Sequence, residues 1–312
     1  MDPLTQTIAL LRPRVPAWKQ LEATGDWAFR FPAITGIAFC LVAAGRCRFQ
    51  VGRRAARPLE AGDYVLLTAP PSWSLAGGKP VTPVDAERVR AGSARRARVV
   101  RPGDGPVTRL FGGHFVLDRS NAGLLDNLMP AVVEIRSSAP TATRLRGVLE
   151  LVDNEAMADR PGRTVILERL LEVMLVEAIR DGASQASEGR TGLLAGLADP
   201  QLATALGAFH GEIRRGWTVA QLAAVAGMSR SVFAERFTRV VGLPPIDYVV
   251  HWRMAFAKDA LRFGRRRLTD VAGDCGYRSV SAFSTAFRRT VGCSPARYAH
   301  GEAVSASGPP AP

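Results

Sequence analysis

The stretch that decides the fold of the C-terminal third occurs twice. It reads TVAQLAAVAGMSRSVFAERFTRVVGLPPIDY at residues 218–248 and LTDVAGDCGYRSVSAFSTAFRRTVGCSPARY at residues 268–298. Five residues recur fifty positions later: Phe233, Phe237, Gly242, Pro245 and Tyr248 match Phe283, Phe287, Gly292, Pro295 and Tyr298. Upstream of each turn the offset is forty-nine, so that Leu222, Ala223 and Gly227 match Val271, Ala272 and Gly276. A repeat of this kind indicates two copies of one structural unit.

Each copy predicts two short helices joined by a sharp turn. We expect Thr218 or Thr269 to cap the first helix, and Ser229 or Ser279 to cap the second. A glycine permits the turn, and two phenylalanines four positions apart anchor the second helix to the core. This is the pattern of a helix-turn-helix, whose second helix can present its outer face to a DNA major groove. The alternative is a helical bundle without a ligand.

One helix is predicted between the copies, at residues 246–263, where no proline or glycine interrupts the sequence. At 1.5 Å per residue it spans roughly 25 Å, of the order of the ~34 Å between successive major grooves on one face of a duplex. Residues 265–267 are all arginine and are placed where phosphates could be met, although such a triplet is also typical of a solvated turn.

The net charge of +13 is concentrated near this repeat. Residues 201–300 carry 15 Lys or Arg against 6 Asp or Glu, whereas the first 200 residues carry 26 against 21. A basic third of the chain predicts an anionic partner, although charge alone also fits a solvated surface.

Residues 199–300 resemble the AraC/XylS family of transcription activators. The resemblance is carried by Trp217-Thr218-Val219, Gly227-Met228-Ser229-Arg230, Trp252-Arg253-Met254, Cys275-Gly276-Tyr277 and Phe287-Arg288-Arg289, together with the repeated residues above. It implies a sequence-specific regulator that binds double-stranded DNA, acts on RNA polymerase and forms a homodimer. Because no export signal is apparent, we expect a cytoplasmic protein with reduced thiols. It leaves open the operator sequence, the target genes and the choice between activation and repression.

The outer faces of the two second helices give the candidate DNA contacts. The residues predicted to contact bases are Arg230, Ser231, Ala234, Glu235, Arg278, Val280, Ser281, Ser284 and Thr285. The residues predicted to contact phosphates are Thr218, Arg236, Arg239, Arg288 and Arg289. Relatives often have Arg where Glu235 and Thr285 stand, so the operator of a relative does not transfer to this chain.

The first half of the chain predicts short strands with frequent turns. Apolar runs at 37–43, 47–51, 64–68, 98–100 and 107–111 are separated by Gly and Pro, and residues 77–97 are predicted to be a loop. Ala44-Gly45 suits a tight hairpin. Residues 8–135, with Leu59-Glu60-Ala61-Gly62-Asp63-Tyr64, resemble a cupin β-barrel, which implies a domain for effector binding or dimerisation. Trp73 and His114 are candidate residues of an effector pocket.

A metal-dependent cupin enzyme is the rival interpretation, and a non-specific architectural DNA binder is a third. The enzyme would need two or three histidines with a carboxylate, and the first 200 residues contain only His114. We therefore predict no catalytic residue, metal or cofactor. Cys40 and Cys47 are predicted to share one face of the hairpin, either as an oxidant-sensing pair or as two buried apolar residues.

The overall prediction is an α+β chain: an N-terminal cupin-like antiparallel β-barrel with helices, then an all-α domain with two helix-turn-helix units. The predicted boundaries are 1–180 for the regulatory domain, 181–198 for a linker, 199–300 for the DNA-binding domain and 301–312 for a disordered tail. Apolar stripes predict helices at 124–128, 145–152 and 165–179, and the last could pack on the barrel or form a dimer interface. Neither an export signal nor a membrane span is apparent.

Overall fold

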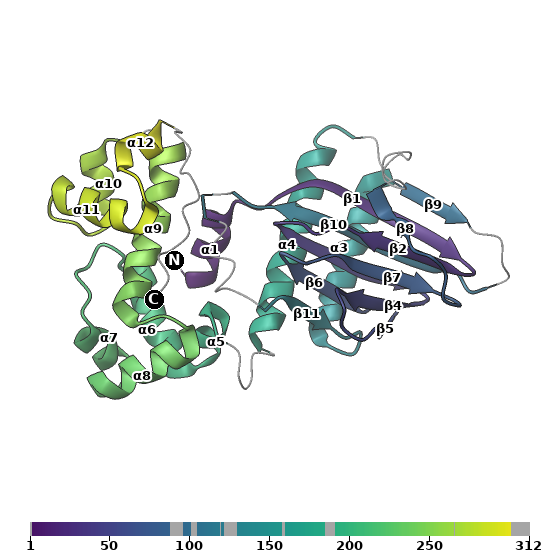
Figure 1. The fold of residues 1–312 in the computed structure, drawn as a ribbon, viewed down its shortest axis with the longest axis horizontal. Coiled ribbons are helices and arrows are strands. Elements are labelled where there is room, and N and C mark those ends of the chain that lie inside the picture. Colours follow the sequence, from purple (N-terminus) through teal and green to yellow (C-terminus); the bar gives the residue numbers. More distant parts are fainter. Residues whose placement is uncertain are drawn as a thin grey trace. The chain divides into compact units, whose positions relative to one another are not determined.

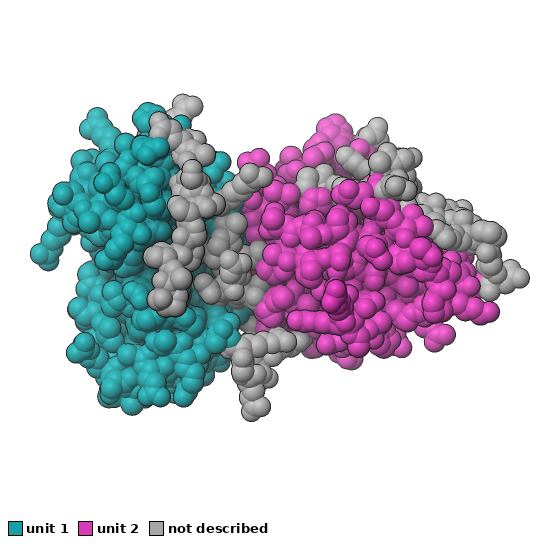
Figure 2. Space-filling view, viewed as in Figure 1, with its two compact units in different colours: residues 1–12, 118–128, 187–312 teal, residues 13–117, 129–186 magenta. Residues whose placement is uncertain are grey.

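The computed structural model describes residues 2–87, 96–100, 105–118, 120–121, 130–157, 160–184, 191–264 and 266–300. The chain divides into two compact units (Figure 2). The β unit consists of Pro13–Leu117 and Met129–Ala186, and the helical unit of Met1–Arg12, Asp118–Leu128 and Ser187–Pro312. The predicted tail, 301–312, and the predicted helix at 124–128 lie outside the described residues.

The β unit contains two sheets, which confirms the predicted α+β class with a cupin-like N-terminal part (Figure 1). The six-stranded sheet has the order β11-β6-β3-β10-β1-β9, and the five-stranded sheet the order β5-β4-β7-β2-β8. The strands are β1 Arg14–Thr24, β2 Trp27–Phe31, β3 Ile37–Ala44, β4 Arg46–Val51, β5 Arg57–Glu60, β6 Tyr64–Thr68, β7 Trp73–Gly77, β8 Val84–Asp85, β9 Arg96–Val100, β10 Thr108–Val116 and β11 Val132–Ile135. Neighbours pair antiparallel, except that β9 pairs parallel with β1 and β8 parallel with β2.

The central strand β3 of the six-stranded sheet is buried on both faces. Along β3, Ala38, Cys40 and Val42 point into the core between the sheets, where they join Phe29 and Leu75 of the other sheet. The alternate residues of β3 are buried as well, because α3 (Pro140–Met157) and α4 (Arg163–Ser184) pack together and α4 contacts β11 and β1. This double burial explains why β3 reads as a continuous apolar run rather than an alternating one.

The predicted hairpin at Ala44-Gly45 is wrong. β3 pairs with β6 and β10, whereas β4 pairs with β5 and β7 of the other sheet, so the chain turns a corner between sheets instead of reversing within one. Gly45 is required at this corner, because its φ is +77° and a Cβ there would lie 2.5 Å from the carbonyl oxygen of Val107. The predicted loop at 77–97 contains β8 and the start of β9.

The motif Leu59-Glu60-Ala61-Gly62-Asp63-Tyr64, which carries the resemblance to cupins, ends β5 and begins β6. Asp63 is 3% exposed and accepts hydrogen bonds from the backbone N–H groups of Glu60 and Ser137 and from the guanidinium of Arg136. The carboxylate thus ties the turn to the segment that follows β11.

The helical unit is built around one long helix, α9 (Pro245–Phe263), which lies between two groups of short helices (Figure 1). The other helices are α1 Pro3–Leu11, α5 Leu193–Ala198, α6 Pro200–Gly211, α7 Val219–Val225, α8 Arg230–Val241, α10 Leu268–Asp274, α11 Val280–Val291 and α12 Pro295–Ala299. The continuous helix predicted between the two repeats is α9.

Residues 1–12 belong to the helical unit, whereas the sequence placed them in the regulatory domain. The apolar face of α1, including Ile8 and Leu11, is buried, and Arg12 donates to both oxygens of Asp259 on α9. From the second short segment of this unit, the Asn121 amide donates to the carbonyl of Ala255, also on α9. The boundary differs because these contacts join residues far apart in the sequence. None of the described helices is long and apolar enough to cross a membrane.

Candidate nucleic-acid interface and pocket

The first repeat folds as a helix-turn-helix. Thr218 caps α7 in a reciprocal capping box, in which its Oγ1 accepts from the N–H of Gln221 and the Gln221 side chain accepts from the N–H of Thr218. Gly227 has a φ of +66° in the turn, and Ser229 then caps α8. The predicted caps and turn are therefore in place.

The second repeat folds the same way with one difference. Ser279 caps α11 as predicted, and Gly276 has a φ of +76° in the turn. Thr269 does not cap α10, because that helix begins at Leu268 and its N-cap residue is Arg267, which makes no side-chain cap hydrogen bond. The offset of forty-nine that relates the upstream halves carries Thr218 onto Arg267, so the repeat itself pointed to the position that the structure shows.

Both second helices are anchored to the core by their phenylalanines. On α8, Phe233 and Phe237 are buried, and Phe237 packs edge-on against Tyr248 of α9. On α11, Phe283 and Phe287 are buried in the cluster that contains Met254 and Ala257 of α9. α8 and α11 are therefore fixed to successive stretches of one helix.

The predicted base-contacting residues lie mostly on the exposed sides of α8 and α11. Arg230, Ser231, Glu235, Arg278, Ser281 and Thr285 are exposed, while Ala234 and Ser284 are half-buried. Val280 differs, because it packs against the core cluster of α9 and α11, so only part of its side chain is exposed. No signal in the sequence separated Val280 from its exposed neighbours, since it occupies the first position of the helix.

Two of the predicted phosphate contacts have partners within the protein. Arg236 donates to Asp199, the N-cap residue of α6, at 2.9 Å from Nε and 2.6 Å from Nη2, and also to the side chain of Gln201. Thr218 is engaged in its capping box. By contrast, Arg239, Arg288 and Arg289 are exposed, and no carboxylate among the described residues pairs with them.

The sequence prediction missed Val232, which is 54% exposed on α8. Its counterpart fifty positions later, Ala282, is exposed on α11. Small apolar side chains on a recognition helix can contact the methyl group of thymine. The repeat could have identified both, since each precedes the first anchoring phenylalanine of its helix.

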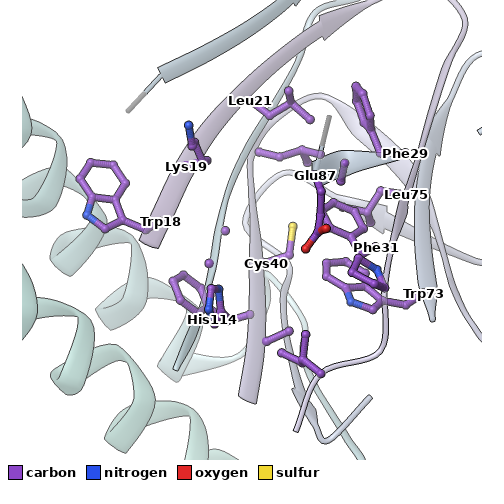
Figure 3. A pocket seen from close by; sticks show the side chains of 18 residues that line it. Trp18, Lys19, Leu21, Phe29, Phe31, Cys40, Trp73, Leu75, Glu87 and His114 are labelled. Atoms are coloured by element: carbon purple, nitrogen blue, oxygen red, sulfur yellow. The ribbon is translucent and has the colours of Figure 1, made fainter. Parts of the chain in front are cut away.

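The β unit contains a cavity of about 140 Å³ between its sheets (Figure 3). It is lined mainly by apolar and aromatic side chains, and Trp73 and His114, the predicted pocket residues, both line it. Trp73 is stacked on Phe31 with a centroid distance of 3.9 Å. Strands β1 and β10 form part of the wall, through Leu21, Leu110 and Gly112 among others, whereas the Trp18 side chain points toward the helices (Figure 3).

Cys40 and Cys47 lie in one buried core cluster, although not across a hairpin. Burial raises the pKa of the Cys47 thiol to about 12 and raises the pKa of Cys40 well above its ordinary value. Because the thiolate is the reactive form, this environment favours two apolar core residues over an oxidant-sensing pair. In the parts of the chain that the structure describes, no group of three or more His, Cys, Asp or Glu side chains is placed to hold a metal ion.

Known protein families match the sequence of both the β unit and the helical unit. A cupin family model matches residues 2–183, and a helix-turn-helix domain model matches residues 222–301. A putative AraC-like transcription regulator of Streptomyces lividans is 38% identical over 96% of this chain and 98% of its own length. A second one, from Streptomyces antibioticus, is 37% identical over 96% of this chain and 98% of its own length.

Among solved structures, the DNA-binding domain of AdpA in complex with a target DNA is 34% identical, covering 33% of this chain and 92% of that one with a TM-score of 0.32. The full-length relatives and the cupin match over residues 2–183 establish the family. The chain belongs to the AraC-like transcription regulators, with a cupin domain followed by a helix-turn-helix DNA-binding domain.

Proposed function

We propose that this chain regulates transcription by placing α8 and α11 in successive major grooves of one promoter. The observation that carries the proposal is that α8 and α11 are equivalent capped helices fixed to successive stretches of α9, each with an exposed polar face. The 19 residues of α9 span about 28 Å at 1.5 Å per residue, which is comparable to the ~34 Å between grooves.

The side chains suggest a division of roles. Arg230, Ser231 and Glu235 on α8, and Ser281 and Thr285 on α11, are exposed hydrogen-bonding groups suited to base edges. Arg239, Arg288 and Arg289 are exposed cations without a carboxylate partner among the described residues, and are suited to phosphates. Arg236 is not retained as a phosphate contact, because Asp199 and Gln201 hold its guanidinium.

The β unit would adjust DNA binding in response to a small apolar or aromatic molecule. Its cavity is close in size to apolar cavities of ~150 Å³ that bind benzene. Strands β1 and β10 line this cavity and pair at Arg14 and Val116. Beside this pair the chain passes between the two units twice, from Arg12 to Pro13 at the start of β1 and from Leu117 to Asp118 after the end of β10. A ligand that shifts these strands would therefore act on the two segments that contact α9.

Homodimerisation through α3 and α4 is part of the proposal, as is an action on RNA polymerase bound at the same promoter. α3 and α4 leave four large apolar side chains exposed, namely Leu151 at 55%, Val165 at 61%, Ile166 at 45% and Val173 at 45%. Because α3 and α4 pack against each other, these side chains are candidates for one apolar interface.

The test is selection of bound sequences from random duplex DNA, followed by a salt titration on the selected duplex. We expect two short half-sites about 10 base pairs apart, bound far more tightly than scrambled DNA. Glu235→Ala should change the preferred bases of one half-site, and Thr285→Ala those of the other. Equal, salt-sensitive binding to every duplex would contradict sequence-specific regulation and favour an architectural DNA binder.

The ligand proposal has a separate test. Toluene should raise the unfolding temperature of the wild-type protein, and Ala38→Leu should remove that effect because the added side chain fills part of the cavity. Ala38 lines the cavity on β3, whereas Ala9→Leu on the exposed side of α1 is the control that should leave the effect intact. If toluene raised the unfolding temperature of the Ala38→Leu variant as much as that of the wild type, toluene would be bound outside this cavity.

A further inference from the structure

Arg253 lies in the middle of α9 and is only 9% exposed. Its guanidinium donates to the carbonyl of Ile213 at 3.1 Å from Nε and 3.0 Å from Nη2, and to the carbonyl of Arg215 at 2.6 Å from Nη2. Both carbonyls belong to the segment 212–217, which leads from α6 into the first helix of the first helix-turn-helix. The planar fork of arginine suits this double contact, which a lysine ammonium cannot reproduce.

The same segment is held from the side of the second helix-turn-helix. Asp274, at the end of α10, forms ion pairs with Arg214 and Arg266 and is 7% exposed. The next residue, Cys275, donates from its thiol to the backbone carbonyl of Arg253 at 3.4 Å. The two helix-turn-helix units are therefore linked directly at residues 213–215, in addition to their attachment to α9.

The contact is close enough to require glycine. A Cβ at Gly276 would lie 2.5 Å from the carbonyl oxygen of Arg214 and 2.9 Å from Nη2 of Arg253, and the φ of Gly276 is +76°. The turn of the second helix-turn-helix thus packs directly on the backbone that leads into the first helix-turn-helix. We name the contact formed by residues 213–215, Arg253, Asp274 and Gly276 the inter-unit brace.

Besides this brace, the two helix-turn-helix units are joined through α9, which contacts α8 of one and α10 and α11 of the other. Each recognition helix packs on its own stretch of α9 through a separate apolar cluster: Phe237 against Tyr248 for α8, and Phe287 with Met254 for α11. These clusters fix each helix-turn-helix to α9, whereas the brace joins the two directly through the Arg214–Asp274 ion pair. A long helix bends at low cost, so two separate anchors hold their mutual angle less firmly than anchors joined by a third contact.

We propose that Arg253 and Asp274 are positioning residues that set the half-site spacing this protein accepts. The inference rests on the proposed function. One additional base pair moves the second half-site by about 3.4 Å and turns it by roughly 35° about the duplex axis. A braced pair of recognition helices cannot follow that change without breaking contacts, whereas an unbraced pair can. The brace thereby converts a fixed angle in the protein into a preference for one spacing in the promoter.

The experiment uses the full-length protein and duplexes that carry the selected half-sites at the selected spacing and at spacings one or two base pairs shorter and longer. The variants are Arg253→Met, Arg253→Lys and Asp274→Asn. The control is Arg12→Met, which removes an arginine contact to α9 that joins neither helix-turn-helix to the other. The unfolding temperature and the active fraction of each variant are measured in parallel.

We expect wild-type affinity to fall about tenfold for each base pair of departure from the selected spacing. Arg253→Met and Asp274→Asn should flatten this dependence to within about threefold, Arg253→Lys should be intermediate, and Arg12→Met should behave as wild type. If Arg253→Met does not fold, Asp274→Asn and Arg253→Lys carry the test.

Two results overturn the inference. A variant whose affinity is lowered equally at all spacings, with the wild-type preference intact, shows that the brace only stabilises the fold. A flattened profile in Arg12→Met as well shows that the effect is not specific to the brace. A wild-type protein that prefers no sequence at any spacing instead contradicts the proposed function, so the two failures are distinguishable.

Discussion

The ring Nε2 of His210 lies 2.7 Å from the hydroxyl of Tyr248, inside the helical unit. The other ring nitrogen, Nδ1, lies 2.7 Å from Oε1 of Gln6, whose amide nitrogen donates to the His210 carbonyl. Because Oε1 can only accept, Nδ1 carries the ring proton and Nε2 accepts from Tyr248. The neutral imidazole therefore satisfies both partners, and a second ring proton would remove the acceptor that Tyr248 needs.

The first prediction follows from this pair. Burial lowers the pKa of His210 to about 3, from an ordinary value of 6.5. Below pH 6.5 the unfolded chain binds a proton that the folded chain does not, so stability falls as the pH drops toward 3. From pH 7 to pH 5 the expected loss from this residue is about 2 kcal/mol.

Urea unfolding followed by circular dichroism at the two pH values measures this loss. His210→Gln should lower stability at pH 7 and should reduce the pH dependence by that same amount. A His210→Gln protein with the full wild-type loss between pH 7 and pH 5 would assign the effect to other groups.

The second prediction separates two arginines of α8. Arg236→Ala removes the bonds to Asp199 and Gln201, so we expect the free energy of unfolding to fall by about 1 kcal/mol while the salt dependence of DNA binding stays unchanged. Arg239→Ala is the matched variant on the same helix. It should leave stability within about 0.5 kcal/mol of wild type and reduce the slope of log affinity against log salt by about 1.

Denaturant unfolding and a salt titration of binding measure the two quantities on both variants. A reduced salt slope for Arg236→Ala would show that this guanidinium leaves Asp199 when DNA is bound, and would restore it as a phosphate contact.

The third prediction concerns the thiols. Cys40, Cys47 and Cys275 are buried, and burial raises the pKa of each thiol, whereas Cys293 is partly exposed. In the native protein at pH 7, iodoacetamide should modify Cys293 first, and the other three only after unfolding. Mass spectrometry of tryptic peptides measures each site. Rapid modification of Cys40 and Cys47, or a disulfide between them after mild peroxide, would restore the oxidant-sensing hypothesis.

The recognition helices were predictable because the repeat compares two copies within one chain. Matching Phe233 with Phe283 and Ser229 with Ser279 located both second helices, their caps and their buried faces without reference to tertiary contacts. The predicted cap of α10 was wrong. It was chosen because threonine is a common N-cap residue, which favoured Thr269, whereas the offset of the repeat points to Arg267, the N-cap residue in the structure. The internal comparison was a better guide than the propensity of one residue.

The β unit was less predictable because its strands are defined by partners far along the chain. β1 contains Pro16 and does not alternate, and it is a strand because it pairs with β10 about ninety residues later. Gly45 allows either a hairpin or a corner between sheets, and local sequence cannot tell which sheet the next strand joins. Likewise, Arg236 reads as a free surface cation until the N-cap of α6 is known to lie beside it.

The last prediction concerns α1, whose assignment to the helical unit has no signal in the local sequence. Its side chains Ile8, Leu10 and Leu11 are 8%, 7% and 1% exposed, so deletion of residues 1–12 uncovers apolar surface on α6 and α9 as well as removing the Arg12–Asp259 and Gln6–His210 contacts. We expect the free energy of unfolding of the helical unit to fall by about 3–6 kcal/mol, and Leu11→Ala to cost about 2–4 kcal/mol. Ala9→Gln, on the exposed side of the same helix, is the matched control and should change stability by less than about 0.5 kcal/mol.

Hydrogen exchange of the amides of α6 and α9 measures the loss within this unit. Unchanged protection after the deletion would show that α1 is dispensable for the DNA-binding fold. Reduced protection would have a consequence for regulation, because Arg12 is followed directly by Pro13 of the β unit and then by β1, which lines the cavity. A displacement of β1 would then pull on α1 through Arg12 and Pro13. Because α1 stabilises α9, such a displacement would affect the helix to which both recognition helices are attached.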